Sequence, residues 1–337
     1  MTAELNRKVV LAKRPDGVPD ESCFRVEDEE LAPLENGQVR IDVSHLSIDA
    51  FIRTTFEEVA YHGAAQVSAT IVALGVGRVR ESRSGRFKPG DAVMAPLGAQ
   101  TIATLPDVML QPIDEKRAPM TASLGVLGMT TGLTAYFGIR EVGRVQPGET
   151  VVVSAAAGAV GCLAGQIAKL DGAARVIGIA GGMEKCSFLT KELGFDAAID
   201  YKGEDVDQRL RELAPEGIDV YFDNVGGPML DVVLDQIREQ ARVVICGAIS
   251  QYHGDMSKGV RGPNLYLRLA ERHARMEGFA VTHFGAQFGE AEAQLVEWLG
   301  SDSLKLPERI ENGIENFGAT LQMLFEGGNT GKLLLAV

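Results

Sequence analysis

One short segment, residues 154–161, constrains the fold more than any other part of the chain. It is Ser-Ala-Ala-Ala-Gly-Ala-Val-Gly, and it stands between an apolar, β-branched run at 151–154 and a stretch with helical periodicity. Ala155, Gly158 and Gly161 have the spacing of a GxGxxG motif, with alanine in the first place. Small residues there let the backbone turn tightly, approach a pyrophosphate and pack a helix against its strand. The segment therefore predicts a dinucleotide-binding turn, although Ala/Gly-rich turns also occur for close packing alone.

The start of the helix after this turn supplies the binding groups. The backbone N–H groups of Ala159, Val160 and Gly161 lie in the first turn, where a helix has no internal acceptors for them. Together with the positive end of the helix dipole, they suit a phosphate.

The chain after residue 121 alternates strands with helices. We expect strands at 151–154, 175–180, 197–200, 218–225 and 241–249, and helices at 158–170, 183–193 and 229–237. Such alternation indicates right-handed βαβ crossovers and a parallel sheet with helices on both faces. We therefore assign residues 121–294 to a Rossmann domain with a doubly wound parallel sheet, and the chain to the α/β class.

The first third of the chain has a different pattern. Short alternating runs, such as 38–44, 69–80 and 91–95, are separated by Gly, Pro and Asp, which is typical of an antiparallel, partly closed β-barrel. We expect residues 1–120 to form this substrate domain. Residues 295–337 are expected to complete it, with the tail carrying helices at 291–299 and 314–325 and a last strand at 332–337.

Composition excludes several classes of partner. The 337 residues carry a net charge of −13 without any Lys/Arg-rich block, which disfavours nucleic acid and anionic membranes. The apolar runs are far shorter than the ~20 residues that span a bilayer, and residues 1–13 lack the pattern of a signal peptide. The four cysteines are Cys23, Cys162, Cys186 and Cys246, scattered without a CxxC pair. Reduced thiols and a cytoplasmic location are expected.

The end of the second Rossmann strand indicates which dinucleotide binds. An NAD-selective site usually places Asp or Glu there, to accept hydrogen bonds from the adenosine ribose. Here residues 179–182 are Ile-Ala-Gly-Gly, and Lys185 follows in the first turn of the next helix, where an ammonium can reach a 2′-phosphate. Glu184, next to Lys185, argues against a 2′-phosphate site, and Lys185 is alternatively a solvated surface charge. The balance favours NADP(H).

A catalytic zinc ion is disfavoured by the distribution of its usual ligands. Zinc needs three protein ligands and an open position. The candidates are Cys23, His45 and His62 in the first half, and His253, His273 and His283 in the second, without HExxH or paired-cysteine spacing. We expect no metal site. Without a Lewis acid, a reduction driven by NADPH is favoured over alcohol oxidation.

Longer motifs carry a family resemblance across nearly the whole chain. They are LSIDAFIR (46–53), GVGRV (75–79), GMTTGLTAYFGI (128–139), AAAGAVG (155–161), GQIAKL (165–170), IAGGMEKC (179–186), LGFDAAIDYK (193–202), FDNVGG (222–227), CGAISQY (246–252), RMEGF (275–279) and NTGKLLL (329–335). With them the chain resembles the zinc-independent prostaglandin/leukotriene reductases of the medium-chain dehydrogenase/reductase superfamily. That group includes bacterial curcumin reductases and plant alkenal double-bond reductases.

The resemblance implies a fold and a reaction. The fold is a GroES-like β-barrel domain beside the Rossmann domain, in a homodimer. The reaction is NADPH-dependent reduction of the carbon–carbon double bond of α,β-unsaturated ketones or aldehydes. In it, hydride reaches the β-carbon, and the α-carbon takes a proton from solvent or from Tyr252.

The resemblance also implies roles for individual residues. The expected cofactor ligands are Thr131, Ala155, Gly158, Ala159, Val160, Gly161, Gly181, Lys185, Tyr201, Asn224, Cys246 and Asn329. Among them, Lys185 and Tyr201 would contact the 2′-phosphate, and Asn224 and Asn329 the nicotinamide side. The expected substrate pocket contains Phe51, Arg53 and Tyr252, with Tyr252 as the catalytic residue that steadies the enolate. Tyr201 and Asn224 are alternatively ordinary loop residues, and Asn329 alternatively serves a turn.

Two segments depart from the group's pattern. Residues 50–53 are Ala-Phe-Ile-Arg where the group usually has Pro-Tyr-Met-Arg, and residues 66–74 replace a Gly-rich approach to the GVGRV motif. Both would line the substrate entrance, so the physiological substrate and its stereochemistry stay open. Two other functions also stay open: a quinone or carbonyl reductase on the same fold, and a non-catalytic NADPH-binding protein.

Overall fold

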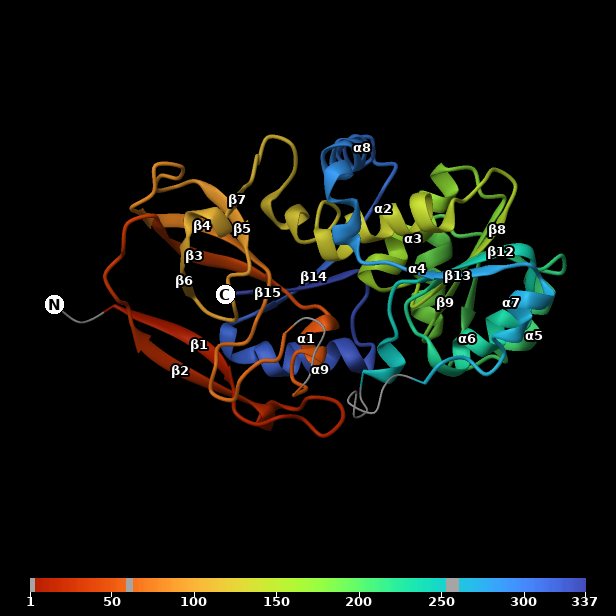
Figure 1. Ribbon diagram of the computed structural model, residues 1–337, viewed down its shortest axis with the longest axis horizontal. Helices are drawn as coiled ribbons and strands as arrows, with labels where there is room; N and C mark the ends of the chain where they lie inside the picture. Colours follow the sequence, from red (N-terminus) through yellow and green to blue (C-terminus); the bar gives the residue numbers. More distant parts are fainter. Residues whose placement is uncertain (1–3, 59–62, 253–260) are drawn as a thin grey trace.

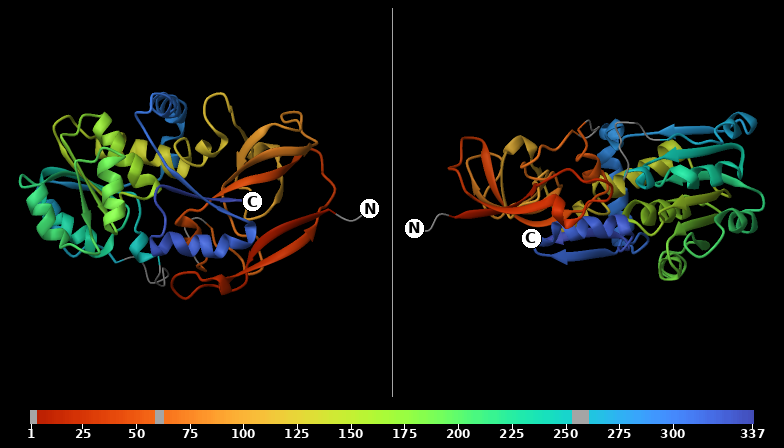
Figure 2. Two further views of the ribbon diagram at one scale, coloured as in Figure 1. Left: turned by 180° about the vertical axis from the view of Figure 1, so that it is seen from behind. Right: turned by 90° about the horizontal axis from the view of Figure 1, so that it is seen from below.

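The computed structural model describes residues 4–58, 63–252 and 261–337. Two sheet-based bodies lie side by side along the long axis of the molecule, with the N-terminal strands at one end and the parallel sheet at the other (Figure 1). The C-terminal segments return between them, which the reverse view shows as well (Figure 2). Within the described residues, no helix has the length and hydrophobicity that a membrane crossing requires.

The second body is built on a six-stranded, wholly parallel sheet. Its strands are β8 (Thr150–Ser154), β9 (Arg175–Ala180), β10 (Ala197–Asp200), β11 (Ile218–Asp223), β12 (Ile237–Ile245) and β13 (Arg275–Gly278). The order β10-β9-β8-β11-β12-β13 makes β8 and β11 neighbours at the point where the winding direction reverses. This is the 3-2-1-4-5-6 order of a Rossmann fold, so the expected α/β class is confirmed.

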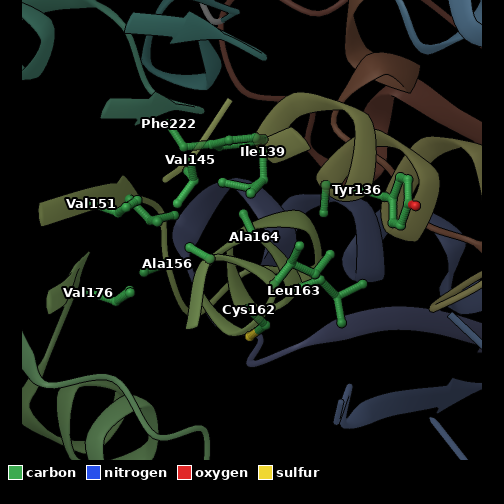
Figure 3. Close-up of a cluster of buried hydrophobic side chains, with 14 of the residues drawn as sticks. Tyr136, Ile139, Val145, Val151, Ala156, Cys162, Leu163, Ala164, Val176 and Phe222 are labelled. Atoms are coloured by element: carbon green, nitrogen blue, oxygen red, sulfur yellow. The ribbon is translucent and has the colours of Figure 1, made fainter. Parts of the chain in front are cut away.

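Successive side chains of β8 are buried on alternate faces of the sheet, so both faces must be covered. Val151 and Val153 are buried on one face and Val152 on the other, because successive side chains of a strand point in opposite directions. The first face packs against α2 (Thr134–Phe137), α3 (Ala159–Leu170), α4 (Met183–Lys191) and α8 (Phe288–Gly300). The opposite face packs against α5 (Val206–Leu213), α6 (Gly227–Leu234) and α7 (Leu267–Glu271). Figure 3 shows part of the first core, in which Val151 of β8, Leu163 of α3 and Phe222 of β11 belong to one cluster of buried side chains.

The first body has a seven-stranded sheet and a separate two-stranded ribbon. The sheet contains β3 (Gln38–Ser47), β4 (Gly75–Ser82), β5 (Ala92–Ala95), β6 (Ile102–Pro106), β7 (Gln111–Pro112), β14 (Glu308–Asn312) and β15 (Lys332–Ala336). The ribbon pairs β1 (Leu5–Leu11) with β2 (Phe24–Glu30). Two helices, α1 (Phe51–Thr54) and α9 (Phe317–Glu326), accompany these strands.

The end of the chain belongs to the first sheet. β15 pairs antiparallel with β3, and β14 pairs parallel with β15. Ile314, Phe317 and Leu321 are buried in the same core as the N-terminal strands. The divisions expected at residues 120 and 294 stay predictions, and α8 runs across the second of them while packing on the Rossmann core.

Several element boundaries differ from expectation. The strand expected at 69–80 begins only at Gly75, and residues 308–312 form a strand where none was expected. The helix expected at 229–237 ends at Leu234, because the strand begins at Ile237, which pairs with Ile218. That strand stops at Ile245 rather than 249, because the next two N–H groups both donate to the carbonyl oxygen of Asp223.

Candidate functional site

The turn after β8 forms an anion-binding helix start. Ala155 adopts a left-handed conformation (φ +47°), and Gly158 caps α3 in an extended conformation without any side-chain hydrogen bond. The first-turn N–H groups therefore have no side-chain acceptor. A Cβ at Gly161 would lie 2.4 Å from the carbonyl oxygen of Ala155, so only glycine lets the turn close so tightly. These donors fit a pyrophosphate.

A segment from the end of the chain lies across this turn. The N–H of Gly331 donates to the carbonyl oxygen of Ala157 at 2.8 Å, and Gly158 and Gly331 form a parallel β-bridge. Two residues earlier, Asn329 is 5% exposed, and its Nδ2 donates to the carbonyl oxygen of Gly331 at 3.2 Å. The structure thus places Asn329 close to the start of α3, and its role as a cofactor ligand stays a prediction.

The ends of β9 and β10 bring the expected 2′-phosphate residues together. A Cβ at Gly181 would lie 2.9 Å from Cε1 of Tyr201, so the tyrosine ring covers this glycine. Lys185, in the first turn of α4, donates through Nζ to the carbonyl oxygen of Gly327 at 2.8 Å. Lys202 also lies here, because its Cε would be 3.0 Å from the same Cβ on Gly181.

Electrostatics at this corner depend on two lysines and one aspartate. Burial, followed by repulsion from Lys202, lowers the pKa of Lys185. Asp200 accepts hydrogen bonds from the N–H groups of Gly182 (2.7 Å) and Lys202 (3.0 Å), which lower the pKa of its carboxyl. The carboxylate of Asp200 therefore does lie at the end of β9. It comes from the neighbouring strand β10, and one of its oxygens already accepts hydrogen bonds from two backbone N–H groups. Neither Lys202 nor Asp200 was expected from the sequence, although both flank Tyr201 in the LGFDAAIDYK motif.

A buried polar network joins the ends of the two central strands. Asp223 is fully buried, and its Oδ1 accepts bonds from Ser154 Oγ (3.0 Å) and Tyr221 OH (2.8 Å). The N–H groups of Val225 (2.9 Å) and Gly226 (3.0 Å) donate to the same oxygen. Burial raises the pKa of Asp223, whose Oδ2 has no partner within the described residues. The sequence signal for this network is the FDNVGG motif, of which only the asparagine was assigned a role.

Asn224 is held by this network. Its backbone N–H donates to Ser154 Oγ at 2.9 Å, and its Nδ2 donates to the carbonyl oxygen of Ser154 at 2.7 Å. Ligands of open α/β sheets bind beyond the strand ends at the switch point, which here lies between β8 and β11. Asn224 therefore lies at this switch point, and its contact with the cofactor stays a prediction.

Tyr252 follows β12 after a short 3₁₀ turn at Ile249–Gln251. Its hydroxyl oxygen accepts a hydrogen bond from the N–H of Ala248 at 3.1 Å. Burial raises the pKa of the phenol, and the bond from Ala248 opposes that effect. Because the bond from Ala248 uses a lone pair, the phenolic O–H itself stays available as a donor. Cys246 lies near the same strand end, and burial raises the pKa of its thiol to about 12.

Two further residues that were expected at the site, Thr131 and Arg53, are buried in the protein. Thr131 is fully buried, and its Oγ1 donates to the carbonyl oxygen of Leu124 at 3.4 Å. Arg53 is 1% exposed: its Nε donates to the carbonyl oxygen of Gly17 at 2.9 Å, and Nη1 pairs with Glu57 at 2.6 Å. A buried guanidinium requires partners, and this one finds them inside the first body. The place of Arg53 in the substrate pocket stays a prediction.

Phe51 packs against the edge of the first core, and its place in the pocket stays a prediction. Within residues 4–58, 63–252 and 261–337, no three His, Cys, Asp or Glu side chains are grouped to hold a metal ion. His45 is partly buried, which lowers its pKa, and its Nδ1 lies 2.7 Å from Ser44 Oγ. His62 and His253 lie outside the described residues.

A Rossmann sheet in this order, with a β-sheet body that the end of the chain rejoins, defines a medium-chain dehydrogenase/reductase. Residues 7–113 match a family described as the N-terminal domain of oxidoreductase, and residues 159–298 match one described as zinc-binding dehydrogenase.

Known relatives are similar to this chain over nearly its full length. An NADP-dependent oxidoreductase of Bacillus subtilis is 41% identical over 100% of this chain and 99% of its own. The NADPH-dependent curcumin reductase of Escherichia coli is 36% identical over 98% and 97%. The crystal structure of CurA from Vibrio vulnificus in complex with NADPH superposes with a TM-score of 0.92, at 35% identity over 98% and 99%. The chain belongs to the zinc-independent prostaglandin/leukotriene reductase group of this superfamily.

Proposed function

We propose that the protein uses NADPH to reduce the carbon–carbon double bond of α,β-unsaturated ketones and aldehydes. The observation that carries the proposal is the position of Tyr252. A phenol whose oxygen accepts from Ala248 N–H stands beyond β12, on the carboxyl side of the parallel sheet. The names of the curcumin reductase and the NADPH complex among the relatives support both the substrate class and the cofactor.

The residues present fit NADP(H). The uncapped N–H groups of residues 159–161 would hold the pyrophosphate, with Gly158 and Gly161 giving it room. Lys185 and Tyr201, beside Gly181, would hold the 2′-phosphate. Asn224 and Asn329 would hold the nicotinamide side, with Thr131 and Cys246 nearby. When bound, NADPH supplies the hydride.

Tyr252 acts on the substrate carbonyl. Negative charge develops on the carbonyl oxygen as the β-carbon is reduced, and the phenolic O–H donates a hydrogen bond to that oxygen. The bond that Tyr252 receives from Ala248 N–H polarises the phenol and strengthens its donation. One such donor contributes on the order of 3 kcal/mol to lowering the barrier in a dry site. Solvent or the same phenol returns a proton to the α-carbon.

The proposal also covers the substrate entrance, the oligomeric state, the cellular location and the partners of the protein. Residues 50–53 and 66–74 set the shape of the substrate entrance. The protein acts as a homodimer in the cytoplasm, without nucleic-acid or membrane partners. The net charge of −13 supports the absence of nucleic-acid partners, and the unpaired outer edge of β13 in the described residues supports the dimer. Light scattering of the purified protein tests the dimer.

A substrate screen with product analysis tests the reaction. NADPH oxidation is followed over enals, cyclic enones, long-chain enones and quinones, and the products are identified by mass spectrometry and NMR. A saturated ketone or aldehyde is the expected product. An allylic alcohol, or turnover restricted to quinones, would instead establish a carbonyl or quinone reductase. Tight NADPH binding with no turnover of any substrate would establish the non-catalytic alternative.

A further inference from the structure

Five residues near the end of the chain, 327–331, connect the two bodies of the molecule. We call them the C-terminal strap. The strap leaves α9 and enters β15, yet both of its ends are bound to the Rossmann body. Its first carbonyl, that of Gly327, accepts from Lys185 Nζ at 2.8 Å. Its last N–H, that of Gly331, donates to the carbonyl oxygen of Ala157 at 2.8 Å.

The path of the strap leaves little freedom. Gly327 ends α9 in a left-handed conformation (φ +70°), and Arg309 Nη1 donates to the carbonyl oxygen of Gly328 at 2.7 Å. Gly331 also has positive φ (+69°), and a Cβ there would lie 2.1 Å from the carbonyl oxygen of Pro307. A displacement of one end of such a short, restrained segment therefore displaces the other end as well.

Lys185 sits where the strap meets the 2′-phosphate corner. Its ammonium has three N–H donors, and Gly327 uses one of them. Lys202 repels the ammonium, while Glu184 and the Cys162 thiol are the other titratable groups that face it. A phosphate dianion held by the two remaining donors would offset that repulsion and fix the ammonium against Gly327.

We propose that Lys185 is a positioning residue as well as a phosphate ligand: it links the 2′-phosphate, through the strap, to Asn329. The inference rests on the proposed use of NADP(H). Asn329 lies two residues from Gly327 and is bonded to Gly331, so fixing the first end of the strap fixes the amide at the nicotinamide side. A cofactor without the 2′-phosphate leaves the Lys185 ammonium held only by Gly327 and repelled by Lys202. NADPH therefore raises kcat relative to NADH, besides lowering KM.

Hydrogen exchange with two cofactor fragments tests the link directly. 2′,5′-ADP and 5′-AMP both lack nicotinamide, so any protection of the strap must come from the adenosine end. At equal fractional occupancy, 2′,5′-ADP should slow exchange in the peptide containing Gly331 several-fold, and 5′-AMP should not. In Lys185→Met the difference between the two fragments should vanish. Lys191→Met, on the exposed last turn of the same helix, should keep it.

Two outcomes separate this inference from the proposed cofactor. If calorimetry finds 2′,5′-ADP no tighter than 5′-AMP, NADP(H) preference itself is refuted. If 2′,5′-ADP binds more tightly but leaves strap exchange unchanged in the wild-type protein, the positioning role alone is refuted. Kinetics provide the second readout. In the wild-type protein, saturating NADH should give a lower kcat than saturating NADPH. In Lys185→Met, the two cofactors should give equal kcat values. Equal kcat values for the two cofactors in the wild-type protein would also overturn the inference.

Discussion

The side chain of Asn224 donates to the carbonyl oxygen of Ser154 at 2.7 Å, which joins the ends of the two central parallel strands across the switch point. A second bond, from the Asn224 N–H to Ser154 Oγ at 2.9 Å, fixes the same residue from its backbone. The orientation of the amide is thereby set before any ligand arrives, with its carbonyl oxygen left to accept from a carboxamide.

Asn224→Asp tests that preorganisation. The substitution places a carboxylate oxygen against the carbonyl oxygen of Ser154, where two acceptors repel each other, so the side chain must turn away. We expect NADPH affinity to fall roughly tenfold or more, since a lost bond to a charged or buried group amounts to about 1–3 kcal/mol. Fluorescence titration of NADPH measures it. Unchanged affinity in a folded variant would remove Asn224 from the cofactor site.

Tyr252→Phe tests the proposed donor. The ring stays, and only the O–H is lost, so NADPH affinity should hardly change. Turnover of the best enone should fall roughly 10- to 1000-fold, with a smaller change in KM. Tyr266→Phe is the matched control, because Tyr266 is 58% exposed and the same atom is removed there. If Tyr252→Phe turns over as fast as that control, the phenol is only a pocket wall.

The pH dependence of cofactor preference reports on Lys185. Its pKa lies below the ordinary 10.5, through burial first and Lys202 second. A lysine is charged below its pKa, so the preference for NADPH should be lost as pH rises through that lowered value. Lys202→Met removes a repelling charge, which raises the pKa of Lys185 and should move the loss to higher pH.

The measurement is the ratio of kcat/KM for NADPH to that for NADH, from neutral pH to about pH 10. Glu184 and Cys162 face the same ammonium and are unchanged in the variant. A midpoint that stays in place after Lys202→Met would show that the two lysines are not coupled.

Metal removal should have no effect. The sequence has no ligand set with catalytic zinc spacing, so elemental analysis should find no stoichiometric zinc, and a chelator should leave the rate intact. Activity that disappears on chelation and returns with zinc would refute a metal-free reaction.

Lys332 and Asp49 form a largely buried ion pair at 2.6 Å, with the lysine side chain 1% exposed and the aspartate side chain 11%. Lys332→Met leaves the carboxylate buried without its counter-charge and should cost about 3–5 kcal/mol of unfolding free energy. Adding Asp49→Asn should recover part of this loss. Lys305→Met breaks an exposed pair with Asp302 and should change stability by less than about 1 kcal/mol.

Denaturant titration measures all three variants. A loss for Lys332→Met as small as that for Lys305→Met would show that water reaches the buried pair.

The features that the sequence predicts well are those with local causes. The turn at 155–161 is recognisable because its small residues are required by contacts within the turn, such as that of Gly161 with Ala155. Lys202 and Asp223 were not predicted, because each also depends on a neighbour at the end of another strand: Gly181 for Lys202 and Ser154 for Asp223. The burial of Arg53 depends on Gly17, 36 residues away in the chain, and no local pattern records that contact.

The pairing of β15 with β3 has a consequence for how the protein is made. A ribosome releases the N-terminal strands first, and domains generally fold as units during synthesis. Here β3 reaches its β15 neighbour at Leu334–Ala336 only after the whole Rossmann body has been synthesised. Until then the first sheet presents an unpaired edge, which is a site for association with other chains. The protein is therefore exposed to misassembly throughout translation of its Rossmann body, and truncation by even a few C-terminal residues would leave that edge permanently open.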